Sequence, residues 1–242
     1  MPTLSIVIPA YNEEARLPVT LGRVLDYLRR SPWTLAEVLV VDDGSQDATA
    51  AAAEEFAREN PMARLLKNPG NRGKGYSVRH GMLKAKGDWV LFTDADLSAP
   101  IEELDKLMAA ALERGASVVI GSRALDRSLI EVRQSAFRET AGRIFNLFMR
   151  ALTGLPFWDT QCGFKLFEGR AAQEVFRRLR LERFGFDVEA LFIARLLGYC
   201  TIEIPVRWSH SAGTKVSLFR DSVSMFLDLL RVRWHHLLGR YR

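Results

Sequence analysis

The sequence lacks the features that mark a secreted or membrane-spanning protein. Its 242 residues contain no apolar run of about 18 residues, which a membrane-spanning helix needs. The N-terminus enters a strand-like segment at 4–9 without the basic region and cleavage site of a signal peptide. Only two cysteines occur, Cys162 and Cys200, and their spacing fits no metal or redox motif. We therefore expect reduced thiols in a cytosolic protein.

Two widespread nucleotide-binding motifs are missing as well. No GxGxxG follows the first strand-like segment, which argues against a dehydrogenase. The glycine-rich segment GNRGKGYSVRHGM at 70–82 is not a P-loop, because Gly75 follows Lys74 where serine or threonine should stand. The segment does precede an expected helix, so its backbone N–H groups and Lys74 can hold a phosphate. A flexible loop with a solvated lysine is the alternative.

The residues that are present are ordinary in amount but uneven in charge. Apolar residues make up 48% of the chain and charged residues 26%, as in soluble globular domains. The net charge is +5. Residues 207–242 hold seven Lys and Arg against two Asp, so this tail accounts for the whole excess. A basic tail indicates an anionic partner, such as lipid head groups, nucleic acid or a phosphorylated acceptor.

Strand-like and helix-like segments alternate in the first half. The pattern predicts a doubly wound, mostly parallel α/β sheet with right-handed crossovers, whose ligands lie beyond the carboxyl ends of the strands. The expected strands are 4–9, 37–43, 63–67, 89–96 and 117–122, and the expected helices are 14–30, an Ala-rich stretch opened by Ser45 or Asp47, 75–86 and 100–114.

Charged residues follow these strands at their carboxyl ends. Asp42, Asp43, Asp94, Asp96 and Arg123 all occupy such positions, so we expect one crevice to collect them. Asp94 and Asp96 repel each other, and a hard divalent cation such as Mg²⁺ or Mn²⁺ removes that conflict. The alternative is a solvated turn with helix-capping Asp. Asp43 can accept from a nucleobase or a ribose, or it can simply belong to a tight turn followed by a cap.

The second half of the chain has a different pattern. Residues 135–152 and 219–238 carry large apolar residues at helical spacing, interleaved with arginines, so both predict amphipathic helices that can lie on a membrane surface. Packing of the same faces on the sheet or on a partner subunit is the alternative. Between them, 159–167 predicts a loop entering a short strand, 183–198 a loop feeding a helix, and 201–208 an edge-like strand.

Four segments occur in the order seen in inverting family-two glycosyltransferases with the A-type nucleotide-sugar fold: SIVIPAYNEE, VVDDGSQD, GNRGKG and FTDAD. The resemblance covers essentially the whole chain. The longer strings GNRGKGYSVRHGM, DTQCGFKLF, RFGFDVEAL and HSAGTKVSLFRDS resemble dolichyl-phosphate β-glucosyltransferases, and polyprenyl-phosphate mannosyltransferases are the next nearest.

The resemblance implies roles for particular residues. Asp94, Ala95 and Asp96 would meet the donor diphosphate and its metal, and Lys215 would close over that diphosphate. Arg123 would reach a donor or acceptor phosphate, and Asp159 stands where relatives carry an acidic residue near the acceptor. Residues that would line the nucleoside pocket are Pro9, Tyr11, Glu13, Val41 and Asp43.

Two departures from the family pattern concern the metal and the closing lysine. Some mannosyltransferase relatives have a metal-contacting Gln two residues after the second Asp, where this chain has Ser98. A basic residue that those relatives carry before the closing lysine has Arg207 as its nearest counterpart here. Asp159 can orient the acceptor without taking a proton, because a phosphate monoester, with a second pKa near ~6, is largely ionised at neutral pH. A structural loop Asp is the alternative.

We therefore expect a single glycosyltransferase domain over 1–242, with a nucleotide-sugar-binding half at 1–125 and an acceptor- and membrane-facing half at 126–242. The expected reaction is metal-dependent, inverting transfer of a hexose, taken as glucose from UDP-glucose, to a polyprenyl (dolichyl-type) phosphate. The expected place is the cytoplasm, peripheral on the inner face of a membrane, with no nucleic-acid partner and a homo-oligomer left open.

Three alternatives to this function stay open. One is a GDP-mannose-dependent polyprenyl-phosphate mannosyltransferase. Another is a nucleotidyltransferase, although such an enzyme would carry a glycine-rich basic loop where AYNEEARL follows the first strand. The third is a non-catalytic nucleotide-sugar or lipid-binding module.

Overall fold

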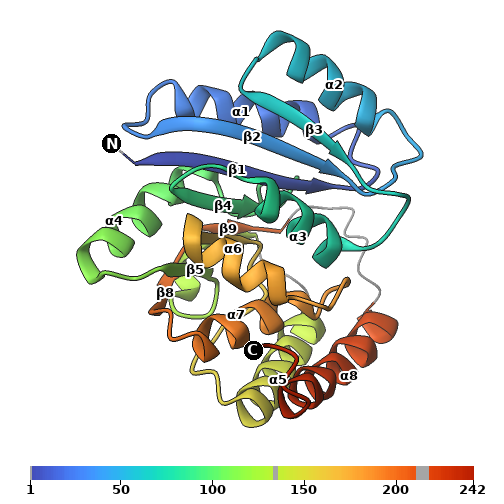
Figure 1. The fold of residues 1–242 in the computed structure, drawn as a ribbon, viewed down its shortest axis with the longest axis vertical. Coiled ribbons are helices and arrows are strands. Elements are labelled where there is room, and N and C mark those ends of the chain that lie inside the picture. The colour runs from blue at the N-terminus through green and yellow to red at the C-terminus, as the bar shows by residue number, and fades with distance from the viewer. Residues whose placement is uncertain (1, 133–135, 211–217) are drawn as a thin grey trace.

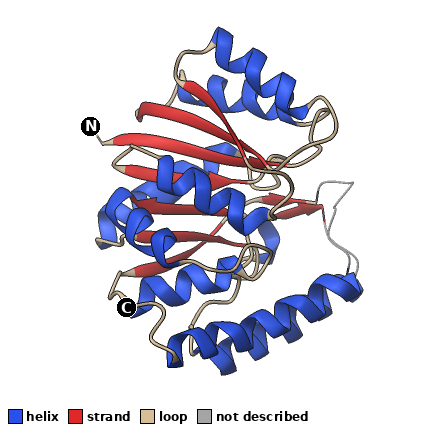
Figure 2. Cartoon of the chain, turned by 45° about the vertical axis from the view of Figure 1, so that its right-hand side comes forward, coloured by secondary structure: helices blue, strands red, loops and turns tan. Residues whose placement is uncertain are grey.

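A twisted seven-stranded sheet runs through the centre of the molecule and is covered by helices on both faces (Figures 1 and 2). The computed structural model describes residues 2–132, 136–210 and 218–242. The strand order is β3-β2-β1-β4-β7-β5-β8, and a second sheet joins β6 to β9. The strands are β1 (Thr3–Ala10), β2 (Thr34–Asp42), β3 (Ala63–Lys67), β4 (Trp89–Thr93), β5 (Val118–Ser122), β6 (Ile130–Val132), β7 (Phe164–Glu168), β8 (Thr201–Pro205) and β9 (Trp208–Ser209).

The five strands expected in the first half are all present, but the sheet is not built from them alone. β1 pairs in parallel with β2 and β4, and β2 with β3. β7 comes from the second half of the chain and lies between β4 and β5, antiparallel to both. The sequence predicted a short strand there, but its alternation of apolar residues could not reveal its place in the sheet. β8 pairs with β5 and forms an edge, as its Pro205 predicted.

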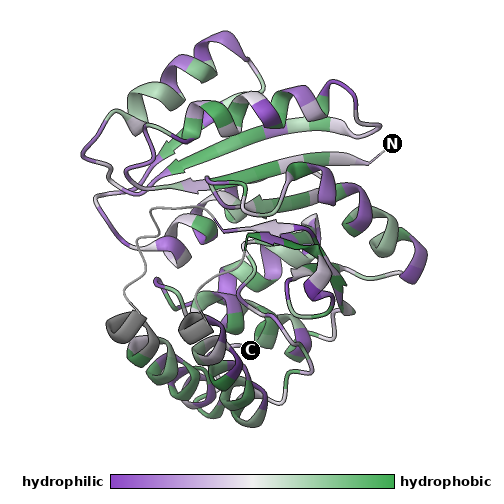
Figure 3. Cartoon of the chain, turned by 180° about the vertical axis from the view of Figure 1, so that it is seen from behind, coloured by the Kyte–Doolittle hydropathy of each residue, from purple (hydrophilic) through white to green (hydrophobic). Residues whose placement is uncertain are grey.

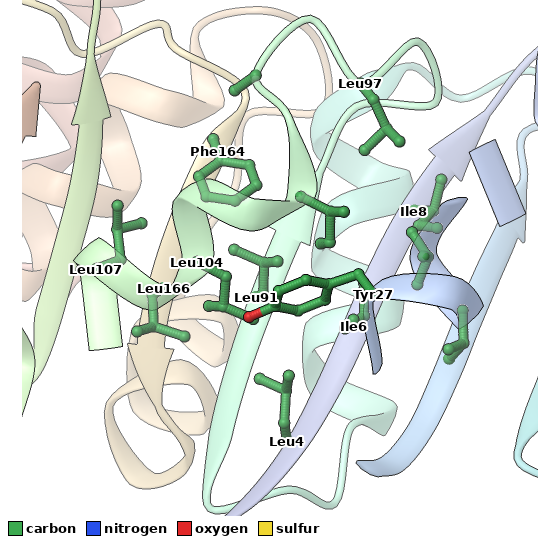
Figure 4. Packing of buried hydrophobic residues seen from close by; sticks show 14 of the residues in the cluster. Leu4, Ile6, Ile8, Tyr27, Leu91, Leu97, Leu104, Leu107, Phe164 and Leu166 are labelled. Carbon is green, nitrogen blue, oxygen red and sulfur yellow. The ribbon is translucent and has the colours of Figure 1, made fainter. Parts of the chain in front are cut away.

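Alternate side chains of the central strands pack into two apolar cores. On one face, Leu4, Ile6 and Ile8 of β1 pack with Leu91 and with α1, which contributes Leu21 and Tyr27 to the same cluster (Figure 4). Val7 of β1 points to the opposite face and belongs to a second apolar cluster, to which α3, α6 and α7 also contribute. Because successive strand residues face opposite ways, a strand that is buried on both faces is apolar throughout.

The helices begin and end close to where the sequence predicted, with two additions. Helix α6 and the short helix η2 were not predicted, and neither was the β6–β9 sheet. The helices are α1 (Leu17–Leu28), α2 (Thr49–Glu59), α3 (Lys74–Lys84), η1 (Ile101–Glu103), α4 (Leu104–Arg114), η2 (Arg127–Leu129), α5 (Ala136–Thr153), α6 (Gly169–Arg178), α7 (Phe186–Leu196) and α8 (Leu218–Leu237).

Helices α5 and α8 lie side by side at the β8 end of the molecule (Figure 1). They meet through an edge-to-face contact of Phe148 with Phe226, whose ring centroids are 5.4 Å apart. Figure 3 shows apolar and polar residues mixed along both helices. Large apolar side chains on this pair that remain exposed are Ile144, Leu147, Phe148, Val223, Phe226, Leu227, Leu230, Trp234 and Leu237. Within the described residues, no helix combines the length and apolarity needed to cross a bilayer.

Candidate active site

Lys74 and Asp94 form the centre of the candidate site. Lys74 opens α3 and Asp94 follows β4, and the Lys74 Nζ lies 2.6 Å from the Asp94 Oδ1. Burial disfavours the charged ammonium, but the negative charges of Asp94 and Asp187 outweigh this and raise the pKa of Lys74. The sequence predicted both residues at the site but did not predict that they pair.

Asp96 lies in a tight turn directly after Asp94. Its Oδ1 accepts a hydrogen bond from the Ser98 N–H at 3.0 Å, and Leu97 adopts a left-handed backbone with φ of 45°. Leu97 N–H also donates to the Asp94 carbonyl. Neither carboxylate caps the next helix, since Pro100 holds the N-cap position of η1. The alternative interpretation of these two residues was a turn followed by a helix cap. The turn is present, but neither carboxylate caps a helix.

The donor set at this turn fits a divalent cation. Asp94 and Asp96 offer hard oxygen ligands. The Asp94 carboxylate already binds one cation, the ammonium of Lys74. Among the described residues, no group of three acidic, His or Cys side chains is arranged around one point. Mg²⁺ is commonly held by one or two carboxylates together with substrate phosphates, so two carboxylates are a sufficient protein contribution.

Asp43 organises the glycine-rich loop. Its carboxylate accepts from the Arg72 N–H at 3.0 Å, the Gly73 N–H at 2.7 Å and the Asn68 side-chain amide at 2.8 Å. Asp43 itself is buried. A loop residue that sequence reasoning missed, Asn68, completes this network and also contacts Ser77 and His80. Asp43 therefore fixes the loop that presents Lys74.

The turn after β2 differs from the sequence prediction, in which Ser45 or Asp47 caps the helix that follows. Ser45 does not cap α2, because its hydroxyl accepts from the Asn12 N–H. Asp47 does accept from the Thr49 N–H, at 3.0 Å, in the first turn of α2, although Ala48 holds the N-cap position. Gly44 has a φ of +72°, and an added Cβ there would lie 2.6 Å from the Gly70 carbonyl carbon. The turn and the glycine-rich loop thus pack backbone to backbone.

Arg123 and Asp159 form a second charged centre. The Arg123 Nε and Nη2 donate to the two Asp159 oxygens at 2.6 and 2.8 Å, and the Arg123 N–H donates as well. Burial alone would raise the pKa of the Asp159 carboxyl, but the Arg123 charge and hydrogen bonds outweigh it and lower that pKa to about 2. The Arg123 guanidinium also lies over the Trp208 ring at 5.3 Å.

A cavity of about 530 Å³ opens beside this pair, between the end of β5 and helix α5. Four arginines line it, Arg123, Arg127, Arg143 and Arg150, together with apolar side chains that include Phe145 and Leu147. Arg127 is paired with Glu139, and Arg150 stacks on Trp158 at 4.1 Å. The walls therefore suit a ligand with an anionic head and an apolar tail. The sequence placed Arg143 and Arg150 on a helix but gave no sign that they meet Arg123.

A buried ion pair, Lys165 with Asp187, lies close to the centre. The Lys165 Nζ lies 2.5 Å from the Asp187 Oδ1 and donates to the Cys162 carbonyl at 2.6 Å. Burial raises the pKa of Asp187 despite its cationic neighbours. Gly163, which precedes β7, accepts the Asp94 N–H and has no room for a Cβ beside the Asp94 carboxylate. Lys165 lies in the string DTQCGFKLF and Asp187 in RFGFDVEAL, but the sequence predicted no role for either residue.

The remaining predicted residues take varied positions. Pro9 and Val41 are register partners on adjacent strands, and Val41 is fully buried in the core. Tyr11 follows β1, and Glu13 pairs with Arg16 at 2.6 Å. The Ala95 carbonyl accepts from the Thr20 hydroxyl. Arg207 pairs with Glu103. Lys215 lies outside the described residues.

The fold resembles several solved sugar-transferring enzymes. A mannosyl-3-phosphoglycerate synthase from Rubrobacter xylanophilus superposes with a TM-score of 0.69 at 22% identity, covering 99% of this chain and 75% of that one. A glucosyl-3-phosphoglycerate synthase from Mycobacterium tuberculosis, solved with Mn²⁺, UDP and glucosyl-3-phosphoglycerate, superposes with a TM-score of 0.66 at 21% identity over 99% of this chain and 80% of that one. These likenesses confirm the A-type glycosyltransferase fold.

Similarity in sequence is closer and more specific. The model of the family "Glycosyl transferase family 2" matches residues 5–176. Dolichyl-phosphate beta-glucosyltransferases from Drosophila melanogaster and Homo sapiens are 39% and 37% identical, each over 99% of this chain and 77% of their own length. The protein from Dictyostelium discoideum is 35% identical over 99% of this chain and 76% of its own. This chain is a glycosyltransferase, and it belongs to family 2, in the group of the dolichyl-phosphate β-glucosyltransferases.

Proposed function

We propose that this enzyme transfers glucose from UDP-glucose to a polyprenyl (dolichyl-type) phosphate, with inversion at the anomeric carbon. One observation carries the proposal: a charged centre suited to a diphosphate adjoins an arginine-lined cavity suited to a lipid phosphate. The 159–163 segment joins them, because Thr160 and Gln161 line the cavity and the Gly163 carbonyl accepts the Asp94 N–H. The names of the similar proteins, which specify dolichyl phosphate and glucose, support the same substrates.

The donor belongs at the carboxyl ends of β1, β2 and β4. The nucleoside lies against Pro9, Tyr11 and Glu13, while Val41 stays in the core beneath them, and the loop held by Asp43 directs Lys74 to the diphosphate. Asp94 and Asp96 would hold Mg²⁺ or Mn²⁺, and the metal would supply charge neutralisation for the departing UDP. Lys215 would add a further positive charge at the same diphosphate. Lys74 leaves Asp94 for a phosphate oxygen as the donor binds, so the site keeps its charge balance.

The acceptor phosphate binds in the cavity, at Arg123. One phosphate oxygen attacks the anomeric carbon on the side opposite to UDP, and the bond from that carbon to the UDP oxygen breaks. A general base is unnecessary, because a phosphate monoester has a second pKa near ~6 and is mostly ionised at neutral pH. Asp159 is unsuited to that role, since its pKa lies near 2. It holds Arg123 in place for the phosphate.

Helices α5 and α8 hold the enzyme on the membrane. Their exposed apolar side chains are interleaved with exposed arginines, including Arg143, Arg231 and Arg233. Apolar burial in the interface and attraction of arginine to anionic lipid add together. The cytoplasmic leaflet is the anionic one, so we place the protein peripherally on the inner face.

A donor panel tests the proposal. The enzyme, one polyprenyl phosphate and Mn²⁺ are incubated with labelled UDP-glucose, UDP-galactose, UDP-N-acetylglucosamine or GDP-mannose, and the labelled lipid is measured. We expect label from UDP-glucose alone, with β configuration. Label from GDP-mannose would make this a mannosyltransferase, and UDP release that ignores the lipid would remove the acceptor from the proposal.

A further inference from the structure

A buried carboxylate that the proposed reaction does not use joins two distant parts of the chain. Glu189, in α7, is fully buried. Its Oε2 accepts the N–H groups of Arg180 and Leu181 at 2.9 and 2.7 Å, and its Oε1 accepts the Tyr241 hydroxyl at 2.7 Å. A buried carboxylate is costly unless its oxygens are satisfied, and here three donors satisfy them. Glu189 therefore ties the 180–183 segment to the C-terminal turn.

The 180–183 segment in turn lies directly against the loop that presents Lys74. The Tyr76 N–H donates to the Glu182 carbonyl at 3.0 Å, and Arg72 pairs with the Glu182 carboxylate at 2.7 Å. A Cβ at Gly73 would lie 2.6 Å from the Glu182 carbonyl oxygen, and one at Gly75 would lie 2.6 Å from the Leu181 carbonyl oxygen. With no room between the two backbones, a shift of one segment moves the other.

A second contact fixes the same region from α8. Gly185 is the N-cap of α7, and a Cβ there would lie 2.5 Å from the Asp228 carboxylate, which accepts a hydrogen bond from the Gly185 backbone. Asp228 is buried and also pairs with Arg231 at 2.7 Å. The 180–185 stretch is thus held at both ends by acidic side chains, Glu189 at its start and Asp228 at its end.

We propose that Glu189 is a positioning residue for donor binding. It holds the backbone of Arg180 and Leu181 on one side and Tyr241 on the other, and so fixes the position of the 180–183 segment against Gly73 and Gly75. That segment in turn fixes the position of Lys74 at the diphosphate. Glu189 does not touch the substrates. The inference rests on the proposed function only in taking the diphosphate to bind at Lys74.

The test compares three variants of the full-length enzyme by calorimetric binding of UDP with Mn²⁺ and by steady-state kinetics. Glu189→Leu keeps most of the side-chain volume but leaves the N–H groups of Arg180 and Leu181 and the Tyr241 hydroxyl without their acceptor. We expect UDP affinity to fall about tenfold or more, the KM for UDP-glucose to rise in step, and the KM for the lipid acceptor to stay unchanged. Glu189→Gln can still accept from both N–H groups and donate to Tyr241, so it should restore UDP affinity to within about twofold.

Val232→Ala is the matched control for lost stability. Val232 is fully buried in α8, and its side chain has no group that could hydrogen-bond to the Glu189 network, so Val232→Ala should lower the melting temperature and leave UDP affinity intact. Equal UDP binding by wild type and Glu189→Leu would overturn the inference, as would a Gln variant as weak as the Leu variant. If Glu189→Leu does not fold, Tyr241→Phe decides: it removes one bond, and unchanged UDP affinity there overturns the coupling to the C-terminal turn. Failure of the wild type to bind UDP would instead refute the proposed donor.

Discussion

The ammonium of Lys74 and the carboxylate of Asp94 lie 2.6 Å apart, one at the start of a helix and the other at the end of a strand. Each therefore neutralises the other before any ligand arrives. In the proposed mechanism a divalent cation would compete with Lys74 for Asp94, and a diphosphate would compete with Asp94 for Lys74. Metal and nucleotide must therefore bind together if neither the Lys74 ammonium nor the Asp94 carboxylate is to be left without a partner of opposite charge.

Replacing Lys74 should separate these two effects. In Lys74→Met, Asp94 loses its competing cation, so Mn²⁺ alone should bind about three- to tenfold more tightly, as expected for one charged hydrogen bond. UDP in the presence of Mn²⁺ should bind more weakly, and turnover should drop. Calorimetry with Mn²⁺ and with Mn²⁺ plus UDP measures both. Lys84→Met, on the exposed side of the same helix, is the control. Weaker binding of Mn²⁺ alone would contradict the competition.

Asp96→Asn should remove metal dependence together with activity. The amide keeps the size of the side chain and can still accept from the Ser98 N–H, so the turn survives, but a charged metal ligand is lost. We expect no measurable turnover with Mg²⁺ or Mn²⁺ and an unchanged melting temperature without metal. Transfer of glucose at the wild-type rate, or full wild-type activity in excess chelator, would refute a metal at this turn.

Asp43→Ala should affect donor binding and stability together. The change strips three donors, the N–H groups of Arg72 and Gly73 and the amide of Asn68, of their acceptor. A loss of about 1.5–3 kcal/mol is typical of a charged hydrogen bond. We expect the donor KM to rise by the corresponding factor and the melting temperature to fall. A lower melting temperature with unchanged donor KM would reduce Asp43 to a structural turn residue.

The Arg123–Asp159 pair should make the stability of the protein depend on pH. Folding lowers the pKa of Asp159 from 3.8 to about 2, so the carboxylate form stabilises the native state above pH ~4, and this contribution is lost as the pH falls towards 2. The difference in melting temperature between wild type and Asp159→Asn should hence be constant from pH 5 to 8 and shrink below pH 4.

Turnover should follow the acceptor and not Asp159. The rate should fall on the acid side with an apparent pKa near ~6, the second pKa of the phosphate monoester. A phosphonate acceptor, which has a higher second pKa, should shift that limb upward, whereas a limb set by Asp159 would stay where it is. Asp159→Asn should raise the acceptor KM and leave the donor KM unchanged, because Arg123 loses the side chain that orients it.

The basic and apolar face of α5 and α8 should bind anionic vesicles. Changing Arg231, Arg233, Arg240 and Arg242 together to Gln should reduce binding to liposomes with anionic lipid at low salt and slow transfer to a long-chain acceptor. A short, water-soluble acceptor should be used almost as well as before, because the catalytic groups are unaltered. Sedimentation with vesicles and parallel assays measure this. Wild-type enzyme that ignores such vesicles would mean that another component delivers the lipid.

Local sequence was enough to predict the strands around the donor site. The stretch WVLFTDAD predicted a buried strand ending in carboxylates, and β4 does end at Thr93 immediately before them. The helix boundaries were less accurate at Ser45, because an isolated pattern cannot tell a cap from a hydroxyl that serves Asn12, 33 residues away. Short polar side chains satisfy whichever backbone group comes within reach.

Pairings between distant segments could not be predicted. Lys165 reaches Asp187 from β7, whose place between β4 and β5 is not encoded by periodicity. Lys74 reaches Asp94 from the start of α3, and this contact depends on how α3 packs beside the end of β4. Of the apolar residues predicted for the membrane face, Leu229 is buried against the core, whereas Trp234 and Leu237 are exposed as predicted. The helical spacing identified an apolar stripe, but only the packing of α8 decides which part of it faces inward.

The position of β7 has a consequence for how the protein is made. β5 hydrogen-bonds to β7 and β8, and both lie later in the chain. A ribosome that has released residues 1–125 has thus supplied β5 but neither of its partners, and β4 still lacks its neighbour on that side. β4 and β5 cannot pair with β7 until residue 168 has emerged, and β5 cannot pair with the edge strand β8 until residue 205 has emerged. The central sheet is therefore complete only when β8 has emerged, and a fragment that ends at residue 125 should aggregate through its open strand edges.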